Sequence, residues 1–249
     1  MGTDIHFATQ YRENELAQWR RAERLVPNPY ASDPGEPAKK REEWDSGRNY
    51  RLFAILAGVR NGVGFAGVVT GTPVQPVAEP RGLPEDFVAE MKNECHEGTW
   101  MGGHSQSWLS LRELLDYDWT QVRACCGVVD AKTFLHWDGF RQLTGELNEP
   151  PKEYCGGVSG PKVKIVSTEE ARARIHELNT QSPNPLEGYY QKSEDEMHKI
   201  LGFNYVESTW TEEYAFSAGD FWRVTMPKLI KLGRAFGEEN VRIVFGFDS

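Results

Sequence analysis

The 249-residue chain predicts a single α+β domain, built on a mixed, mostly antiparallel sheet that includes both terminal strands and is flanked by helices. Three observations predict this class. Residues 1–12 alternate between two faces as a half-buried strand does, and the stretch "VRIVFGF" at 241–247 forms a second strand. Between them strands and helices mix, but strand–helix–strand units are too few for a doubly wound parallel sheet.

Composition limits the classes of function. The formal charge of -9 argues against broad binding of duplex nucleic acid, which needs many Lys and Arg contacts to phosphate. No apolar run approaches the ~20 residues of a membrane span, and the first residues lack the pattern of a signal peptide. We therefore expect a cytoplasmic protein with no membrane partner. No C-x-x-C motif occurs, so the four cysteines are predicted to be reduced thiols.

The first half of the chain predicts two elements and one excursion. Residues 13–24 are charged and favour a helix. Residues 27–47 hold four prolines and many charges, which predicts an irregular surface excursion. In "RNYRLFAILAGVR", Leu52, Ile55 and Leu56 recur at helical spacing, so a buried helix is expected there.

The stretch "RNGVGFAGVVTG" at 60–71 spells G-x-G-x-x-G and raises the question of a phosphate-binding loop. A dinucleotide fingerprint leaves a strand and opens a helix, so that the helix N-terminus meets the pyrophosphate. Here the preceding segment reads as a helix, and the following "VVTGTPVQPV" cannot start one. We interpret the stretch as a hairpin or flexible loop within a Gly/Pro-rich connection over about 60–84.

The second half shows clear helix starts. Pro84 is suited to the first turn of a helix over about 84–95. Ser110 and Ser167 each precede a glutamate by three residues, the capping-box pattern that opens a helix. The other predicted elements are a strand at 162–166, a strand over "NYVESTWTEEYAF" and a helix over "GDFWRVTMPKLIKLGRAFG" with a kink at Pro227.

Four residues are candidates for acid–base chemistry: His6, His104, Asp4 and Asp248. Asp4 and His6 share one face of the first strand because strand side chains repeat every two residues. If the terminal strands are neighbours, Asp248 joins them. A carboxylate–imidazole pair performs general acid–base work, or binds a metal with a second carboxylate. The alternative is structural, with a histidine bonded to a carbonyl and an aspartate capping a turn.

Two histidines are each followed by a hydroxyl, as His6-x-x-Thr9 and His104-x-x-Ser107. Phosphoesterases with paired H-x-T/S motifs place the histidine and the hydroxyl on one face of a strand. A spacing of three residues puts the hydroxyl on the opposite face, unless a bulge corrects it.

Candidate ligand-binding residues are Arg60, Arg81, Ser105 and Trp108. The planar fork of arginine suits phosphate or carboxylate, and tryptophan can stack on a base. His104 and Ser105 would bond polar edges of such a ligand. The alternative is a self-paired charge cluster beside a core tryptophan. No motif for a cofactor or a metal site is present.

The blocks "MGTDIH", "RNYRLFAILAGVRNG", "PVAEPRGLPED", "HSQSWLSLRELLDYDW" and "VRIVFGFDS" together resemble a family of uncharacterised proteins of tailed phages and some bacteria. The blocks span nearly the whole chain. The sequence departs from that pattern at Thr3, where cysteine is frequent, and at Gly246, where an aromatic residue is frequent. The resemblance implies no established activity.

Three functions follow from the residues and the resemblance together. The first is a phage accessory protein that binds a small anionic, nucleotide-like ligand in the host cytoplasm, as a sponge against a nucleotide immune signal. The alternative is a hydrolase or phosphodiesterase that acts on a nucleotide or modified nucleic acid through the His and Asp residues. The third is a protein–protein interaction module. The sequence leaves open the ligand, whether a bond is broken, and whether the chain forms a homo-oligomer.

Overall fold

A computed structural model describes residues 2–42, 44, 48–87, 103–145 and 150–248. The α+β class is confirmed, with the two terminal strands in one sheet. The chain divides into two compact units, which are described separately. Unit 1 comprises Met1–Asn61, Pro73–Gln121 and Tyr214–Ser249, and unit 2 comprises Gly62–Thr72 and Val122–Glu213. The chain crosses between the units four times, so no single linker marks the division in the sequence.

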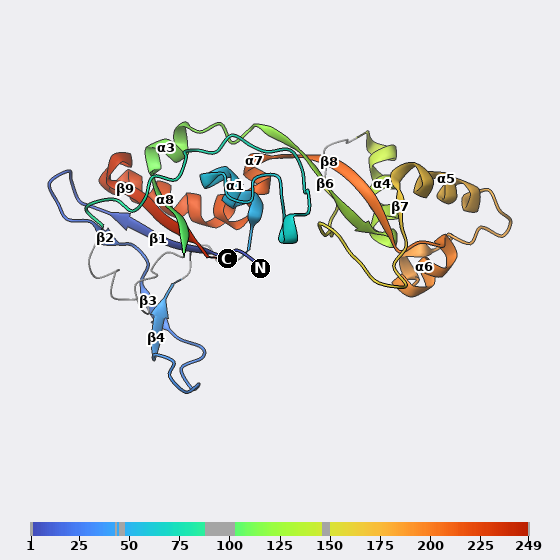
Figure 1. The fold of residues 1–249 in the computed structure, drawn as a ribbon, viewed down its shortest axis with the longest axis horizontal. Coiled ribbons are helices and arrows are strands. Elements are labelled where there is room, and N and C mark those ends of the chain that lie inside the picture. The colour runs from blue at the N-terminus through green and yellow to red at the C-terminus, as the bar shows by residue number, and fades with distance from the viewer. Residues whose placement is uncertain (1, 43, 45–47, 88–102, 146–149, 249) are drawn as a thin grey trace. The chain divides into compact units, whose positions relative to one another are not determined.

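Unit 1 is built on a four-stranded sheet in the order β2-β1-β9-β5, in which every neighbouring pair is antiparallel (Figure 1). A 3-10 turn at Glu238–Asn240 and a π-helical turn at Phe221–Thr225 also belong to the unit. Its strands and helices are β1 Ile5–Tyr11, β2 Arg20–Arg21, β3 Leu25–Pro27, β4 Lys39–Arg41, α1 Tyr50–Ala57, β5 His104–Ser110, α3 Leu111–Asp116, α7 Tyr214–Ser217, α8 Met226–Phe236 and β9 Val241–Phe247.

The terminal strands form the centre of this sheet. β1 pairs with β9 along its whole length, from Ile5 opposite Phe247 to Tyr11 opposite Val241. All seven residues of β9 are buried, which explains why its sequence is almost continuously apolar. The predicted strands at both ends of the chain are therefore confirmed, and they are direct neighbours.

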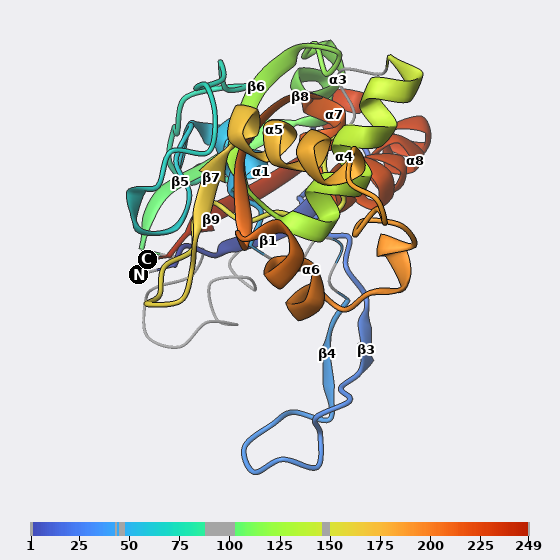
Figure 2. The same ribbon diagram turned by 90° about the vertical axis from the view of Figure 1, so that its right-hand side faces the viewer.

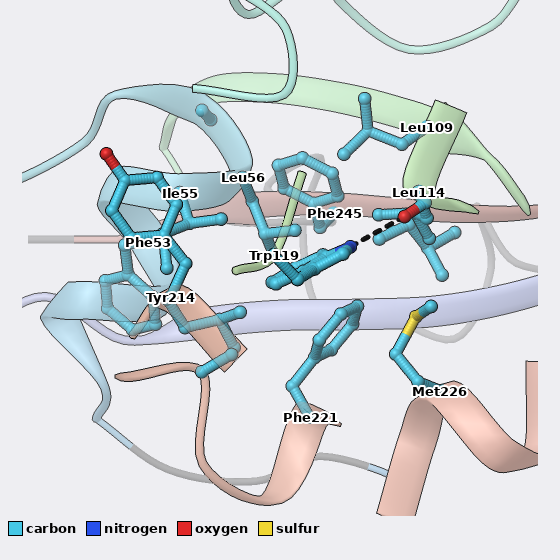
Figure 3. Close-up of a cluster of buried hydrophobic side chains, with 14 of the residues drawn as sticks. Phe53, Ile55, Leu56, Leu109, Leu114, Trp119, Tyr214, Phe221, Met226 and Phe245 are labelled. Carbon is cyan, nitrogen blue, oxygen red and sulfur yellow. Dashed lines mark hydrogen bonds between the residues drawn. The ribbon is translucent and has the colours of Figure 1, made fainter. Parts of the chain in front are cut away.

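One face of the sheet carries the main apolar core of unit 1, shown in Figure 3. The ring of Trp119 packs among side chains from α1, β9 and the π-helical turn, and its Nε1 donates a hydrogen bond of 2.7 Å to the carbonyl of Leu114. Burying each large apolar side chain here stabilises the fold by about 1.5–3 kcal/mol. This face therefore holds the sheet against its helices.

The opposite face holds a buried cation. Arg242 on β9 is 4% exposed, and its guanidinium lies 3.8 Å from the ring centroid of Trp19 and 5.8 Å from that of Trp108. Two further guanidiniums lie against the same two rings. That of Arg12 is 4.7 Å from the centroid of Trp19, and that of Arg81 is 3.8 Å from the centroid of Trp108. Three cations and two indole rings thus form one stack across the sheet.

Two polar side chains satisfy the charge of Arg242. Its Nε donates to Gln10 at 2.7 Å, and its Nη1 donates to Asp86 at 2.8 Å. The other carboxylate oxygen of Asp86 accepts the indole N–H of Trp19 at 2.7 Å. Burial raises the pKa of Asp86, but these bonds outweigh it and lower that pKa overall. Asp86 is therefore ionised beside the buried guanidinium.

The predicted helix over 13–24 is wrong. This segment turns back and forms β2 along β1 instead. The buried carboxylate of Glu23 accepts the backbone N–H of Thr9 and a bond from Arg21 Nε, so it continues the pairing at the edge of β1. Tertiary hydrogen bonds here outweigh the intrinsic helix preference of the charged residues.

The other predictions in unit 1 have the following outcomes. The helix predicted around Leu52 is confirmed as α1, which is capped by the Asn49 side chain and ends at Gly58 with φ +67°. The predicted excursion carries the β3–β4 hairpin, which extends away from the sheet (Figure 1). Of the helix predicted over about 84–95, residues 88–95 lie outside the described residues, and 84–87 form a turn.

The C-terminal helical segment is confirmed, with one difference. The π-helical turn at Phe221–Thr225 runs directly into α8. Pro227 is the second residue of α8 and directly follows the π-helical turn, so the proline lies at the junction between the two helix types. The predicted kink at Pro227 is thus a change of helix type just before the proline.

Unit 2 contains a three-stranded sheet in the order β6-β8-β7, with β6 antiparallel and β7 parallel to the central β8. Helices α4, α5 and α6 enclose its apolar core (Figure 2). The strand predicted at 162–166 begins later than expected. The elements are β6 Val122–Asp130, α4 Ala131–Thr144, β7 Ile165–Ser167, α5 Thr168–Asn179, α6 Glu194–Leu201 and β8 Tyr205–Glu213, with 3-10 turns at Phe65–Gly67 and Tyr189–Gln191.

The glycine-rich stretch belongs to unit 2 and forms a hairpin. Val63 pairs antiparallel with Val69 around the 3-10 turn, and Thr70 and Thr72 then hydrogen-bond to the edge of β6. No helix follows the glycines, so the interpretation as a hairpin is confirmed. Gly67 has φ +76°, a conformation that glycine adopts without strain.

We expect Arg242→Ala to lower the free energy of unfolding by about 3 kcal/mol, because it leaves a gap between two indole rings and removes the partner of Asp86. Arg242→Met should lose less, since methionine fills the space without a charge. Urea denaturation measures both changes. Arg223→Ala removes an exposed ion pair with Asp220 and should change stability by less than about 0.5 kcal/mol. Equal losses for Arg242→Ala and Arg223→Ala would contradict a structural role of the stack.

Candidate functional site

The pairing of β1 with β9 brings Asp4, His6 and Asp248 together at one end of the sheet. Nε2 of His6 lies 3.0 Å from Oδ2 of Asp248. Oδ1 of Asp248 accepts the backbone N–H of Asp4 at 2.9 Å, and the Asp248 N–H donates to the Asp4 carbonyl at 3.2 Å. The side chain of His6 is 49% exposed, so the imidazole is held by protein and open to solvent.

Charge at this end of the sheet is balanced by arginine. Arg48 donates from Nε and Nη2 to the two carboxylate oxygens of Asp4, at 2.8 and 2.7 Å. This fork lowers the pKa of Asp4 and raises that of Arg48. The hydrogen bond from His6 lowers the pKa of Asp248. Both carboxylates are therefore ionised at neutral pH.

The tautomer of His6 follows from this pairing. An ionised carboxylate only accepts hydrogen bonds, so Nε2 of His6 carries the proton and donates to Asp248. In the neutral ring the lone pair is then on Nδ1, which is the atom able to take a proton or accept a bond. Among the described residues, Asp248 is the sole hydrogen-bond partner of this imidazole.

Arg60 lies at the same end of the sheet. Its Nε donates to Thr3 Oγ1 at 3.0 Å, and its guanidinium is 5.5 Å from the ring centroid of Tyr50. The hydroxyl of Tyr50 accepts the backbone N–H of Thr3 at 3.2 Å. Arg60 has φ +54°, a left-handed conformation that is uncommon outside glycine. Thr3 therefore contacts one of the predicted ligand-binding residues.

His104 lies on the other face of the sheet. It is opposite Phe247 on β9, which is opposite Ile5 on β1, so the three share a face, whereas His6 points to the other. The imidazole stacks on Phe247 with centroids 6.1 Å apart, and its Nδ1 is 3.0 Å from Ser105 Oγ. In the described parts of the chain, no contact joins His104 to the other three candidates.

A β-bulge alters the second histidine–hydroxyl motif. Between His104 and Ser107 the register shifts, so three residues of β5 span two residues of β9. His104 and Ser107 therefore face the same side, as the H-x-T/S geometry requires. His6 and Thr9 stay in regular register and face opposite sides. The arrangement with two equivalent motifs is thus not formed.

Arg81 and Trp108 are committed to each other and to α3. Arg81 donates to both carboxylate oxygens of Glu113, at 2.9 and 2.7 Å, and to the Trp108 carbonyl. Its guanidinium also covers one face of the Trp108 ring at 3.8 Å. This geometry fits the alternative of a self-paired cluster, and a ligand would have to displace those contacts.

Sequence reasoning noted Arg48 as one of several nearby arginines but did not place it among the candidate site residues, because no pattern linked it to Asp4. Comparison with protein-family models, with curated proteins and with solved structures finds no match. In the ranges that the structure describes, no helix combines the length and apolarity needed to cross a membrane. Within those same ranges, no three His, Cys, Asp or Glu side chains are grouped so as to hold a metal ion.

The lowered pKa values of Asp4 and Asp248 predict a pH dependence. A carboxylate with a lowered folded pKa stabilises the fold above its ordinary pKa of about 4 and loses that contribution as the pH falls through the folded value. We therefore expect the destabilisation caused by Asp4→Asn to be present at neutral pH and to shrink toward zero in acid. Urea denaturation at several pH values measures it.

Asp33→Asn, at an exposed residue of the β3–β4 loop, is the matched control and should cause no pH-dependent loss. A difference between wild type and Asp4→Asn that stays constant down to about pH 2 would contradict the role of the ionised Asp4–Arg48 pair.

Proposed function

We propose that the chain binds a small anionic, nucleotide-like ligand at the end of β1 and β9. The observation that carries this proposal is the His6–Asp248 contact of 3.0 Å beside the guanidinium of Arg48, with Arg60 held by Thr3 at the same end of the sheet. Arg48 uses two of its five N–H donors on Asp4, so with respect to the described residues three remain for a phosphate oxygen. His6 adds a ring of fixed orientation that can bond the same ligand.

The resemblance to proteins of tailed phages supports a biological role for such binding. A phage accessory protein that sequesters a nucleotide immune signal in the host cytoplasm needs an accessible anion site and no chemical step. The half-exposed side chains of His6 and Arg48 meet the first requirement. The chain's charge of -9 favours a local site over broad binding of polyanions.

A hydrolase is the second candidate, favoured by the same His6–Asp248 pair. Nδ1 of His6 would accept a proton from a water molecule while the water oxygen attacks phosphorus. The P–O ester bond would break, and the leaving oxygen would take a proton from solvent. Asp248 would hold the ring and stabilise its protonated form, as an orienting carboxylate does. The products then separate the two candidates.

The test is to incubate the purified protein with a panel of cyclic and NAD-derived nucleotides, remove unbound material, heat the protein and identify what is released. Intact release supports sequestration, and altered products support hydrolysis. We expect His6→Gln and Arg48→Gln to weaken retention about tenfold each, as loss of a charge-assisted hydrogen bond would. His176→Gln, an exposed histidine on α5, should retain the ligand like wild type.

If the protein neither retains nor converts any nucleotide in the panel, both candidates are contradicted. The protein–protein interaction module is then the function that is left. Equal retention by wild type and His6→Gln would place the ligand elsewhere.

A further inference from the structure

Unit 2 contains a cavity of about 690 Å³. Its walls come from β6, β8, the end of β7 with the start of α5, one side of α4, the hairpin at 62–72 and Gly156, and all of its lining residues belong to unit 2. The volume lies within the range of pockets that hold small molecules. Sequence analysis gave no sign of this cavity, because six separate segments of the chain form it.

The wall formed by α4 and by Arg172 of α5 is cationic and partly buried. Asp138, 3% exposed, accepts two bonds from Arg172, at 3.0 and 2.8 Å, and one from Gln142 at 2.6 Å. Arg141 lies over the ring of Trp137 at 4.4 Å, and burial lowers its pKa. Two guanidiniums therefore face the cavity beside a single buried carboxylate, which favours an anionic group of a ligand at this wall.

The wall at the meeting of β7, β8 and α5 is acidic. Glu169 and Glu207 line the cavity and are exposed to solvent. Glu207 is opposite Ser167 in the parallel register, and its carbonyl accepts the hydroxyl of Thr168 at 2.8 Å. These backbone contacts hold the Glu207 position against the start of α5. Two exposed carboxylates at this wall favour an amine or another cationic group.

Apolar side chains also line the cavity. Val68 and Val69 of the hairpin, Val128 of β6 and the ring of Trp137 all line the cavity. Together with the hydroxyls of Ser208 and Thr209, they would surround an uncharged body of a ligand and bond its polar edges.

We propose that this cavity binds a small zwitterion, an amino-acid-like molecule with one anionic group toward Arg141 and Arg172 and one amine toward Glu169 and Glu207. Three carboxylates and two guanidiniums line the cavity, so its wall carries one net negative charge. That balance disfavours a polyphosphate, which needs an excess of cations, and suits a ligand with charges of both signs. The residues are distinct from those at the end of β1 and β9, so the two proposals succeed or fail separately.

The thiol of Cys126 reports on occupancy, because it lines the cavity and lies 3.5 Å from the Val69 carbonyl. The experiment alkylates the full chain with iodoacetamide and reads each cysteine by peptide mass spectrometry, with Cys155, which does not line the cavity, as the reference. The probes are the common L-amino acids, AMP and inorganic phosphate. We expect at least one amino acid to slow alkylation of Cys126 fivefold or more, saturably, and neither AMP nor phosphate to do so.

Variants separate the two charged walls. Arg141→Gln and Glu207→Gln should each weaken the protecting amino acid at least tenfold, and Glu207→Gln is at an exposed position that tolerates change if Arg141→Gln fails to fold. Arg174→Gln on α5 and Glu213→Gln on β8 are matched controls outside the cavity and should bind like wild type. The proposal is overturned if no amino acid protects Cys126, or if AMP or phosphate protects it equally well. It is also overturned if Glu207→Gln binds the protecting amino acid like wild type.

Discussion

The sheet of unit 1 depends on a charge that it buries. Arg242 belongs to the central strand, yet its partners come from distant segments, with Gln10 on β1, Trp19 beyond it and Asp86 far along the chain. A guanidinium removed from water is costly unless each donor finds an acceptor or an aromatic face. Its Nη2 is buried without a hydrogen-bond partner in the described part of the chain. The aromatic faces of Trp19 and Trp108 therefore compensate for the hydrogen bond that Nη2 lacks. The buried guanidinium therefore requires the segments that carry Gln10, Trp19 and Asp86 to be positioned together. This requirement fixes their positions on the face of the sheet opposite the main apolar core.

Local signals predicted the elements whose causes are local. The capping boxes at Ser110 and Ser167 open helices because the serine and the following glutamate satisfy the first N–H groups reciprocally. The apolar run of β9 follows from its complete burial, whereas β1, predicted as a half-buried strand, is buried on both faces at Ala8, Thr9 and Gln10. The helix predicted over 13–24 is wrong for the opposite reason. The structure of this segment depends on the hydrogen bond between Glu23 and β1, a contact that the sequence of the segment does not reveal.

The candidate site divides in the same way. Asp4 and His6 share a face because of strand periodicity, and their meeting with Asp248 needed only the pairing of two recognisable strands. The position of His104 depends on a β-bulge of one residue, and no residue in "HSQSW" predicts that bulge. The cavity of unit 2 was beyond sequence reasoning, since Arg141 and Glu207 are far apart in the chain and the charges of α4 follow no single stripe.

The register of β1 with β9 has a consequence for how the chain reaches its fold. β1 is synthesised before β9, and the neighbour on that edge arrives only after more than two hundred further residues. During that interval the edge of β1 that faces β9 has its backbone groups unpaired, a state prone to association with other chains. Unit 2, most of which is one continuous segment, can close its own sheet before that partner emerges. The order of synthesis therefore places the pairing of β1 with β9 after the strands of the unit 2 sheet have all been made.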